Sequence, residues 1–184
     1  MPMPMPMPIP VPVPVPATEA QLFDRLAALG VPVETHRHPP VFTVAEAKAV
    51  RDDLAGAHPG FLAGVHSKNL FLKDRRGVLW LVVALEDRPI DLKALRTTIG
   101  AAPLSFASAE RLRDVLGVEP GSVTPFALIN DREAQVAVVL DAEMMRAGVL
   151  NFHPLANTAT TAISPEGLLA FIRSCGHEPR VVEL

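Results

Sequence analysis

Cysteine is nearly absent from the chain, since Cys175 is the single thiol among 184 residues. One cysteine excludes an internal disulfide and any zinc site built from several cysteines. Its scarcity also fits a reducing compartment, so we expect a cytoplasmic protein. Apolar runs long enough to span a bilayer are lacking as well, and we therefore expect no membrane partner.

A strong net charge is lacking too, because the chain carries only −3 at neutral pH. This value excludes the overall positive charge typical of a nucleic-acid-binding protein. The distribution is uneven, however. The segment from Lys68 to Arg113 has nine Lys/Arg and five Asp/Glu, a net charge of +4, which leaves −7 for the remainder. A basic middle in an acidic chain indicates a phosphate-bearing partner.

Common catalytic signatures are also missing: there is no glycine-rich phosphate loop, no nucleophile elbow and no metalloprotease helix. Cys175 and His177 could form a nucleophilic pair, but they follow a predicted helix with no evident third group to orient them, which favours an incidental thiol. His36 and His38 share one face of a predicted strand. Only Glu34 stands near them, which favours a structural or solvated pair over a metal site.

The length and composition predict one domain with a sizeable core and a separate arm. In residues 1–16, Met, Ile or Val alternates with proline. Proline at every second position fixes φ and removes half of the backbone donors, so neither helix nor sheet can form there. We therefore expect an extended, proline-rich arm over residues 1–16 and a folded domain over residues 17–184.

Helix caps and apolar periodicity predict five helices, which begin after Thr18, Thr43, Asp91, Ser108 and Ser164. Strands are predicted over residues 31–37, 70–72, 78–85, 149–152, 158–163 and 180–184. Residues 126–129 and 135–140 predict a second hairpin around Asn130 and Asp131. The short connections favour an α+β fold with a mixed, largely antiparallel sheet and packed helices.

The most informative stretch is the first predicted hairpin. Its two apolar runs, 70–72 and 78–85, are separated by the polar turn 74–77. Lys68 and Asn69 stand just before the first run, where a strand opens onto a surface. A lysine there can hold positive charge beside a pocket while the strand fixes its stem, although a solvated edge lysine has the same pattern.

Two loops add candidate binding residues. The first contains Gly121, Ser122, Val123, Thr124 and Pro125; its glycine permits close backbone approach, and its proline fixes the exit. The second spans residues 152–158 and places the His153 imidazole and the Asn157 amide between two predicted strands. A plain connector and a structural histidine are the alternatives.

Together these stretches resemble the YbaK/ProX-like aminoacyl-tRNA deacylases, which are editing domains associated with prolyl-tRNA synthetase. The resemblance is closest to the free-standing members that hydrolyse Ala-tRNA(Pro). It covers roughly residues 17–184 and rests on segments in the family's order: 38–43 (HPPVFT), 68–74 (KNLFLKD), 104–108 (LSFAS), 121–131 (GSVTPFALIND) and 152–158 (FHPLANT). The proline-rich arm departs from the pattern.

The resemblance implies an α+β editing fold and hydrolysis, in trans, of alanine mischarged onto tRNA(Pro). It implies that Lys68 is needed for activity, that the 121–125 loop lines the aminoacyl pocket, and that His153 lies at the same site. No metal or organic cofactor is expected. Implied partners are the acceptor end of tRNA(Pro) and, transiently, prolyl-tRNA synthetase. Alternatives are a deacylase for Cys-tRNA(Pro) or another small amino acid, and a non-catalytic tRNA-binding module.

These roles are chemically reasonable, because an aminoacyl ester is already activated and needs mainly a positioned water and charge stabilisation. Lys68 would neutralise a phosphate or the developing oxyanion, and His153 with Asn157 would orient water or ribose. Carbonyls of the 121–125 loop would hold the substrate ammonium. The predicted catalytic residues are Lys68 and His153; the predicted substrate-binding residues are Asn69, Gly121, Ser122, Val123, Thr124, Pro125 and Asn157.

Overall fold

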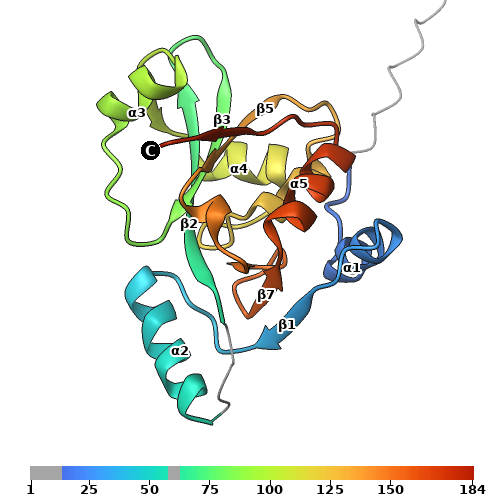
Figure 1. The fold of residues 1–184 in the computed structure, drawn as a ribbon. Coiled ribbons are helices and arrows are strands. Elements are labelled where there is room, and N and C mark those ends of the chain that lie inside the picture. The colour runs from blue at the N-terminus through green and yellow to red at the C-terminus, as the bar shows by residue number, and fades with distance from the viewer. Residues whose placement is uncertain (1–13, 58–62) are drawn as a thin grey trace, which may run out of the picture.

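The computed structural model describes residues 14–57 and 63–184 (Figure 1). Of the predicted arm, residues 1–13 lie outside the described residues, so the division into arm and domain stays a prediction. The first helix, α1 (Glu19–Ala28), begins after Thr18, which forms the predicted capping box with Gln21. None of the helices in the described ranges has the length and apolar character needed to cross a membrane.

The sheet is organised around β2 (Val65–Asp74) and β3 (Leu79–Leu85), which pair antiparallel from Ser67↔Leu85 to Lys73↔Leu79. The other edge of β2 carries β6 (Leu150–Phe152), which is parallel, and β4 (Leu104–Phe106), which is antiparallel. The predicted strands before and after the first turn are therefore confirmed, and β2 begins earlier than residue 70.

The outer strands complete the strand order β1-β7-β6-β2-β3-β5-β8. On one side, β7 (Ala159–Ile163) and β1 (Glu34–Arg37) are added antiparallel; on the other, β5 (Val136–Asp141) and β8 (Arg180–Val182) are added parallel. Four of the seven pairings are antiparallel. The predicted α+β class with a mixed, largely antiparallel sheet is confirmed.

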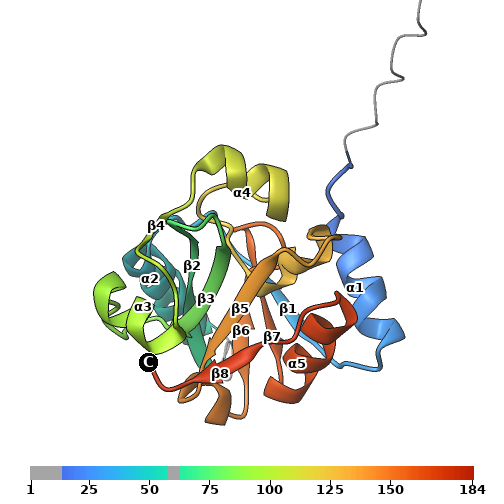
Figure 2. The same cartoon turned by 90° about the horizontal axis from the view of Figure 1, so that it is seen from above.

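The core occupies both faces of β3. Leu79, Leu81 and Val83 face one apolar cluster, whereas Trp80 and Val82 face another, as expected from the two-residue period of a strand. The first cluster is covered by α1, α4 (Ala109–Leu116) and α5 (Pro165–Ser174), the second by α3 (Leu92–Ile99). Figure 2 shows α3 on the opposite side of β3 from α1 and α5. Burial on both faces explains why β3 is apolar throughout.

The second predicted hairpin is wrong. Residues Pro125–Asn130 form a 3-10 helix, in which Pro125 takes the first turn and Thr124 Oγ1 accepts a 3.3 Å hydrogen bond from the Phe126 N–H. Asp131 then turns the chain into β5, because its carboxylate accepts hydrogen bonds from the N–H groups of Gln135 and Val136. A four-residue apolar run fits a buried helical turn as well as a strand, and here the cap and the proline decide.

The turn between β2 and β3 depends on the carboxylate of Asp74, which is 5% exposed. Asp74 Oδ1 accepts hydrogen bonds from the N–H groups of Arg76 (2.9 Å) and Val78 (3.1 Å), and Oδ2 accepts one from Ala102 (3.2 Å). Burial raises the pKa of Asp74, but these three donors outweigh it and hold the pKa below its ordinary 3.8. The charged carboxylate is thus the form that the fold requires.

Asp74→Ala should lower the free energy of unfolding by on the order of 3 kcal/mol, because it removes the shared acceptor of three main-chain N–H groups. Asp91→Ala is the matched control: its exposed carboxylate caps α3 through the N–H groups of Lys93 and Ala94, so the loss should be only about 1 kcal/mol. Urea denaturation at neutral pH measures both. Equal losses would contradict a special role for Asp74.

The contribution of Asp74 should also depend on pH, with a sign fixed by its lowered pKa. It should be complete above the ordinary pKa of 3.8 and disappear as the pH falls through the lower folded value. The difference between the wild type and Asp74→Ala should therefore narrow in acid.

Candidate active site

A cavity of about 300 Å³ lies beside β2, between α2 (Val44–Ala57) and the strands β6 and β7. Figure 1 shows α2 next to the Val65 end of β2, apart from the other helices. The volume is at the lower end of the range for small-molecule sites. The lining residues are His38, Val41, Phe42, Thr43, Val44, Ala47, Val50, Arg51, His66, Ser67, Lys68, Asn69, Glu86, Gly121, Val123, Asn151, Phe152, His153 and Thr160.

Lys68 lies on β2 opposite Ala84 of β3, and its Nζ donates a hydrogen bond to the carbonyl oxygen of Arg88. The backbone of β2 is fixed there by pairing with β3, so the stem of Lys68 starts from a rigid strand. The carbonyl of Arg88 in turn holds the ammonium group at the edge of the cavity. The position of Lys68 therefore depends on how Arg88 is held.

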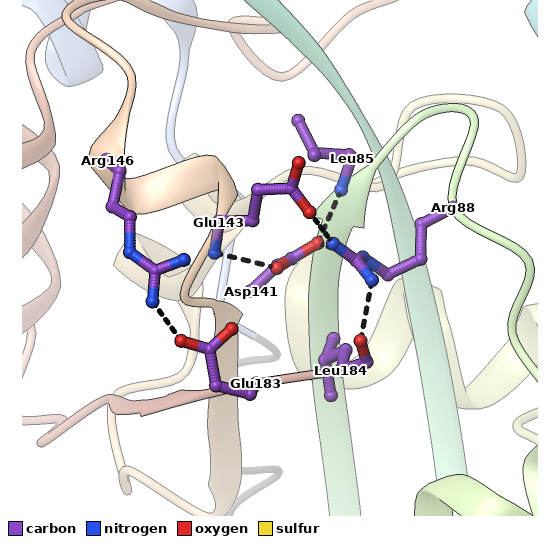
Figure 3. A network of polar contacts seen from close by, with 7 residues as sticks. All are labelled: Leu85, Arg88, Asp141, Glu143, Arg146, Glu183 and Leu184. Carbon is purple, nitrogen blue, oxygen red and sulfur yellow. Dashed lines mark hydrogen bonds and ion pairs between the residues drawn. The ribbon is translucent and has the colours of Figure 1, made fainter.

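Arg88 is held by a network at the far side of β3 (Figure 3). Its Nε donates to Asp141 Oδ2 at 2.6 Å and its Nη1 to the main-chain oxygen of Leu184 at 2.6 Å, and a further N–H donates to Glu143. Asp141 is fully buried and also accepts hydrogen bonds from the N–H groups of Leu85 and Glu143. The guanidinium, and with it the Arg88 backbone, is thereby fixed to the end of β5 and to the segment that follows β8.

The two residues before Arg88 bind α2. Glu86 forms a bidentate ion pair with Arg51 (2.7 and 3.0 Å), in which both side chains are partly buried. Asp87 forms an exposed ion pair with Lys48 at 2.6 Å. We call residues 86–88 the 86–88 turn. This turn connects one wall of the cavity, α2, to the strand network that positions Lys68.

His153 sits at the cavity in a defined tautomer. Its Nδ1 is 2.8 Å from the carbonyl oxygen of Ala159, and since a carbonyl can only accept, Nδ1 carries the proton. Burial, with a smaller contribution from His38, lowers the pKa of His153 below its ordinary 6.5, and the Ala159 hydrogen bond only partly opposes this. At neutral pH the ring is therefore uncharged and Nε2 has a free lone pair, as a general base requires.

His38 is a second cavity histidine that the sequence did not single out for this role. Its Nδ1 donates to the Pro39 carbonyl oxygen (2.8 Å), so Nε2 accepts from the Thr160 hydroxyl (2.8 Å) in the neutral ring. The ring centroids of His38 and His153 are 6.0 Å apart. The sequence signal was available in the 38–43 segment, but only tertiary structure brings it beside His153.

Asn151 is the other residue that sequence reasoning missed. It is 3% exposed, and its Nδ2 donates to the carbonyl oxygens of Ala63 and Val65, both at 3.1 Å. Its Oδ1 is buried without a hydrogen-bond partner, and so is Oδ1 of Asn69, another cavity residue. The available signal was a lone amide in the otherwise apolar strand β6.

The structure brings five predicted site residues to one cavity: Lys68, Asn69, Gly121, Val123 and His153. Ser122, Thr124, Pro125 and Asn157 are not among the lining residues. Thr124 caps the 3-10 helix that Pro125 begins, and Ser122 is buried with its N–H bonded to Glu119. Their roles in substrate binding remain predictions.

Asn157 and Gly121 both act on the segment that contains Phe42, although only Gly121 lines the cavity. Asn157 Nδ2 donates to the Val41 carbonyl oxygen at 2.8 Å, which fixes the segment that leads to Phe42. Gly121 has a φ of +88°, and an added Cβ would lie 3.1 Å from a ring carbon of Phe42. A side chain at position 121 would therefore be strained and would displace the Phe42 ring.

The alternative sites receive no support. The His177 ring is buried, with Nδ1 bonded to the Val136 carbonyl oxygen and Nε2 3.4 Å from Asp131, so its polar contacts lie with the core. Cys175 is half-buried rather than solvent-facing, and burial raises its pKa, which disfavours a reactive thiolate. Within residues 14–57 and 63–184, no group of three or more His, Cys, Asp or Glu side chains is placed to hold a metal ion.

Comparison with known proteins agrees with this geometry. Residues 38–171 match the family model of the aminoacyl-tRNA editing domain. The chain is 40% identical over 168 residues to the bovine (Bos taurus) "Prolyl-tRNA synthetase associated domain-containing protein 1", covering 89% of this chain and 93% of that protein. It is 37% identical over 148 residues to the "Prolyl-tRNA editing protein ProX" of Acetoanaerobium sticklandii, covering 80% and 85%.

A similar solved structure is described as a candidate trans-editing enzyme for prolyl tRNA synthetase. It superimposes with a TM-score of 0.63 at 19% identity and covers 91% of this chain and 98% of the other. At that identity the likeness establishes the fold. The fold and the cavity thus define an editing-type α+β domain. The family match then gives the identification: the chain belongs to the aminoacyl-tRNA editing domain family, as a ProX-like editing domain.

His153 should titrate below its ordinary pKa of 6.5 and, above that pKa, should carry its proton on Nδ1, because the Ala159 carbonyl accepts it. Two-dimensional ¹H–¹⁵N NMR of the imidazole across pH 4 to 8 measures both properties. His38→Gln should move the pKa of His153 upward, since the charge of His38 lowers it, while burial keeps it below 6.5. A proton on Nε2 in the neutral ring would contradict the assignment of the free lone pair.

Proposed function

We propose that the chain is a trans-editing deacylase that hydrolyses the ester of mischarged Ala-tRNA(Pro) in the cytoplasm. The observation that carries the proposal is that Lys68 and His153, whose Nε2 is unprotonated in the neutral ring, both line one small cavity in an editing-domain fold. A binding module would not need a lysine and a base together there. The partners in this proposal are the acceptor end of tRNA(Pro) and, transiently, prolyl-tRNA synthetase.

The proposed reaction is the attack of water on the ester carbonyl carbon. His153 Nε2 takes a proton from the water while the new C–O bond forms, and the Lys68 ammonium stabilises the negative charge on the carbonyl oxygen. The bond to the ribose oxygen then breaks, and the imidazolium returns the proton to that oxygen. The products are free alanine and tRNA with its terminal hydroxyl restored.

The cavity wall favours a small amino-acid side chain. Its apolar lining consists largely of short residues, Val41, Val44, Ala47, Val50 and Val123. A small pocket rejects a larger side chain by steric clash, and this exclusion is stronger than the preference of a large pocket for a large side chain. We therefore expect alanine to be accepted and the ring of proline to be excluded. Cysteine, only slightly larger than alanine, is the second candidate.

The function is tested by incubating the protein with tRNA(Pro) charged with alanine, cysteine or proline and measuring deacylation. Ala-tRNA(Pro) should be hydrolysed at least ten times faster than Pro-tRNA(Pro). Lys68→Ala should lower kcat by about 10²-fold, because it removes charge stabilisation. Lys68→Arg should not fully restore it, since the planar guanidinium cannot replace a compact ammonium.

Lys73→Ala is the matched control, because Lys73 lies on the same strand but is exposed and does not line the cavity. Its kcat should stay within two-fold of the wild type. Circular dichroism of each variant separates misfolding from lost chemistry. Wild-type turnover by a folded Lys68→Ala protein would remove this lysine from the mechanism, and absence of any deacylation by the wild type would overturn the proposed function.

Phe42 supports a nucleotide substrate. The residue is 67% exposed although it lines the cavity, and its N–H donates to Glu46 Oε2 at 2.7 Å. Exposed aromatic rings beside charged grooves commonly stack on nucleobases. Removing such a ring weakens binding by about 1–3 kcal/mol per base. We infer that Phe42 stacks on a base at the acceptor end. Phe106 on β4 is 62% exposed and does not line the cavity.

Phe42→Ala should therefore raise KM for Ala-tRNA(Pro) by roughly ten-fold, with kcat changed less than three-fold, because stacking contributes to binding rather than to the chemical step. Phe42→Trp should keep KM near the wild-type value. Phe106→Ala, which removes a ring of similar exposure, should change neither constant. An equal rise of KM in both alanine variants would indicate a general loss of surface apolarity instead of a base platform.

A further inference from the structure

Asn151 is held by its backbone and by its side-chain nitrogen, whereas its side-chain oxygen has no hydrogen-bond partner. Its backbone lies between two neighbouring strands, opposite His66 of β2 and Ala162 of β7. Its side chain is 3% exposed and borders the cavity. A buried amide in the middle strand of three is costly unless its polar atoms are satisfied.

The orientation of the Asn151 amide is set by its neighbours. Both N–H bonds of Nδ2 are used by the carbonyl oxygens of Ala63 and Val65. A flipped amide would place Oδ1 against two carbonyl oxygens, which repel it, so the nitrogen must face them. Oδ1 is consequently an acceptor without a donor, in a residue that lines the cavity.

Other residues that line the cavity also offer acceptors. Asn69 Oδ1 is also buried without a partner, and His153 Nε2 carries a lone pair. The nearby cation Lys68 already donates to the Arg88 carbonyl, and Arg51 is engaged by Glu86. The acceptor atoms without a donor would therefore be satisfied by a ligand that carries several N–H donors on one small group. A primary ammonium supplies three, whereas a hydroxyl supplies only one.

We propose that Asn151 Oδ1 binds the α-ammonium group of the aminoacyl ester. This inference rests on the proposed deacylase function and deepens it, because it makes Asn151 a specificity residue that selects esters with a free α-amino group. It also moves the expected ammonium site from the carbonyls of the 121–125 loop to a side-chain amide on β6. Esters without the amino group lose the charge-assisted hydrogen bonds.

The test is a set of three tRNA(Pro) esters that differ only at the α-substituent: alanyl (ammonium), lactyl (hydroxyl) and propionyl (hydrogen). Each enzymatic kcat/KM is divided by the spontaneous rate of the same ester, which removes intrinsic reactivity. The wild type should prefer alanyl over propionyl by at least ten-fold, with lactyl between them. In Asn151→Ala this preference should fall to three-fold or less. Asn151→Leu, which is similar in size but lacks the acceptor oxygen, should lose the preference as well.

Asn157→Ala is the control for loss of a structural amide, because Asn157 supports the cavity wall through Val41 without lining the cavity. It should lower the rates of all three esters by the same factor and leave the alanyl preference intact. A merely structural role of Asn151 would give that same pattern. Retention of the preference in folded Asn151→Ala would therefore overturn the inference and return the ammonium to another site.

A wild type that hydrolyses none of the esters would refute the proposed function, whereas one that hydrolyses alanyl and propionyl esters equally well would refute only the ammonium site. If neither Asn151 variant folds, the wild type still decides. The side-chain carbonyl ¹³C signal of Asn151 should shift on binding the amide-linked, non-hydrolysable analogue 3′-alanylamino-adenosine. The 3′-propionylamino analogue should leave it unchanged, and an equal shift with both would contradict the proposal.

Discussion

The buried contact between Arg88 and Asp141 is the interaction on which the rest of the site depends. A fully buried carboxylate such as Asp141 is tolerated only when it is paired and hydrogen-bonded. Here the Arg88 guanidinium and the N–H groups of Leu85 and Glu143 together satisfy it. This arrangement fixes the end of β3 against β5 and leaves the Arg88 carbonyl where Lys68 donates to it.

The 86–88 turn connects this buried contact to the wall of the cavity. Its partly buried ion pair, Glu86 with Arg51, is bidentate and shielded from solvent, so it constrains α2 more than the exposed pair Asp87 with Lys48. One short segment thereby positions both the cationic side chain of the site and the helix that closes one wall. A substitution in this turn is expected to affect binding and chemistry together, because both depend on the same backbone.

The cavity itself departs from the rule that buried polar atoms are paired. Asn69 and Asn151 each keep an unpaired amide oxygen there, and His153 keeps an uncharged ring nitrogen. Elsewhere in the described part of the chain, buried carboxylates such as Asp74 and Asp131 are fully engaged by backbone donors. Trp80 Nε1 and His177 Nε2 are also buried without a hydrogen-bond partner, but they lie away from the cavity. The two amide oxygens belong to residues that line the cavity, and we expect a ligand bound there to complete the hydrogen bonding.

The sequence by itself determined the local features of this protein. The capping box at Thr18, the proline-initiated helix after Ser164 and the hairpin turn that Asp74 begins depend on residues within four positions of each other. The resemblance of several ordered segments also singled out Lys68 and His153 in advance. Both residues now line one cavity, whereas their catalytic roles remain proposed.

Only the tertiary structure decided which distant segments meet. Parallel pairing of β5 with β3 replaced the predicted hairpin, because strand partners are chosen by burial across the whole sheet and not by the intervening turn. The roles inferred for Asn151 and for the carbonyl of Arg88 likewise depend on contacts between segments that are distant in the chain. An unpaired oxygen or an occupied acceptor is a property of neighbours far away in the chain, and no local pattern encodes it.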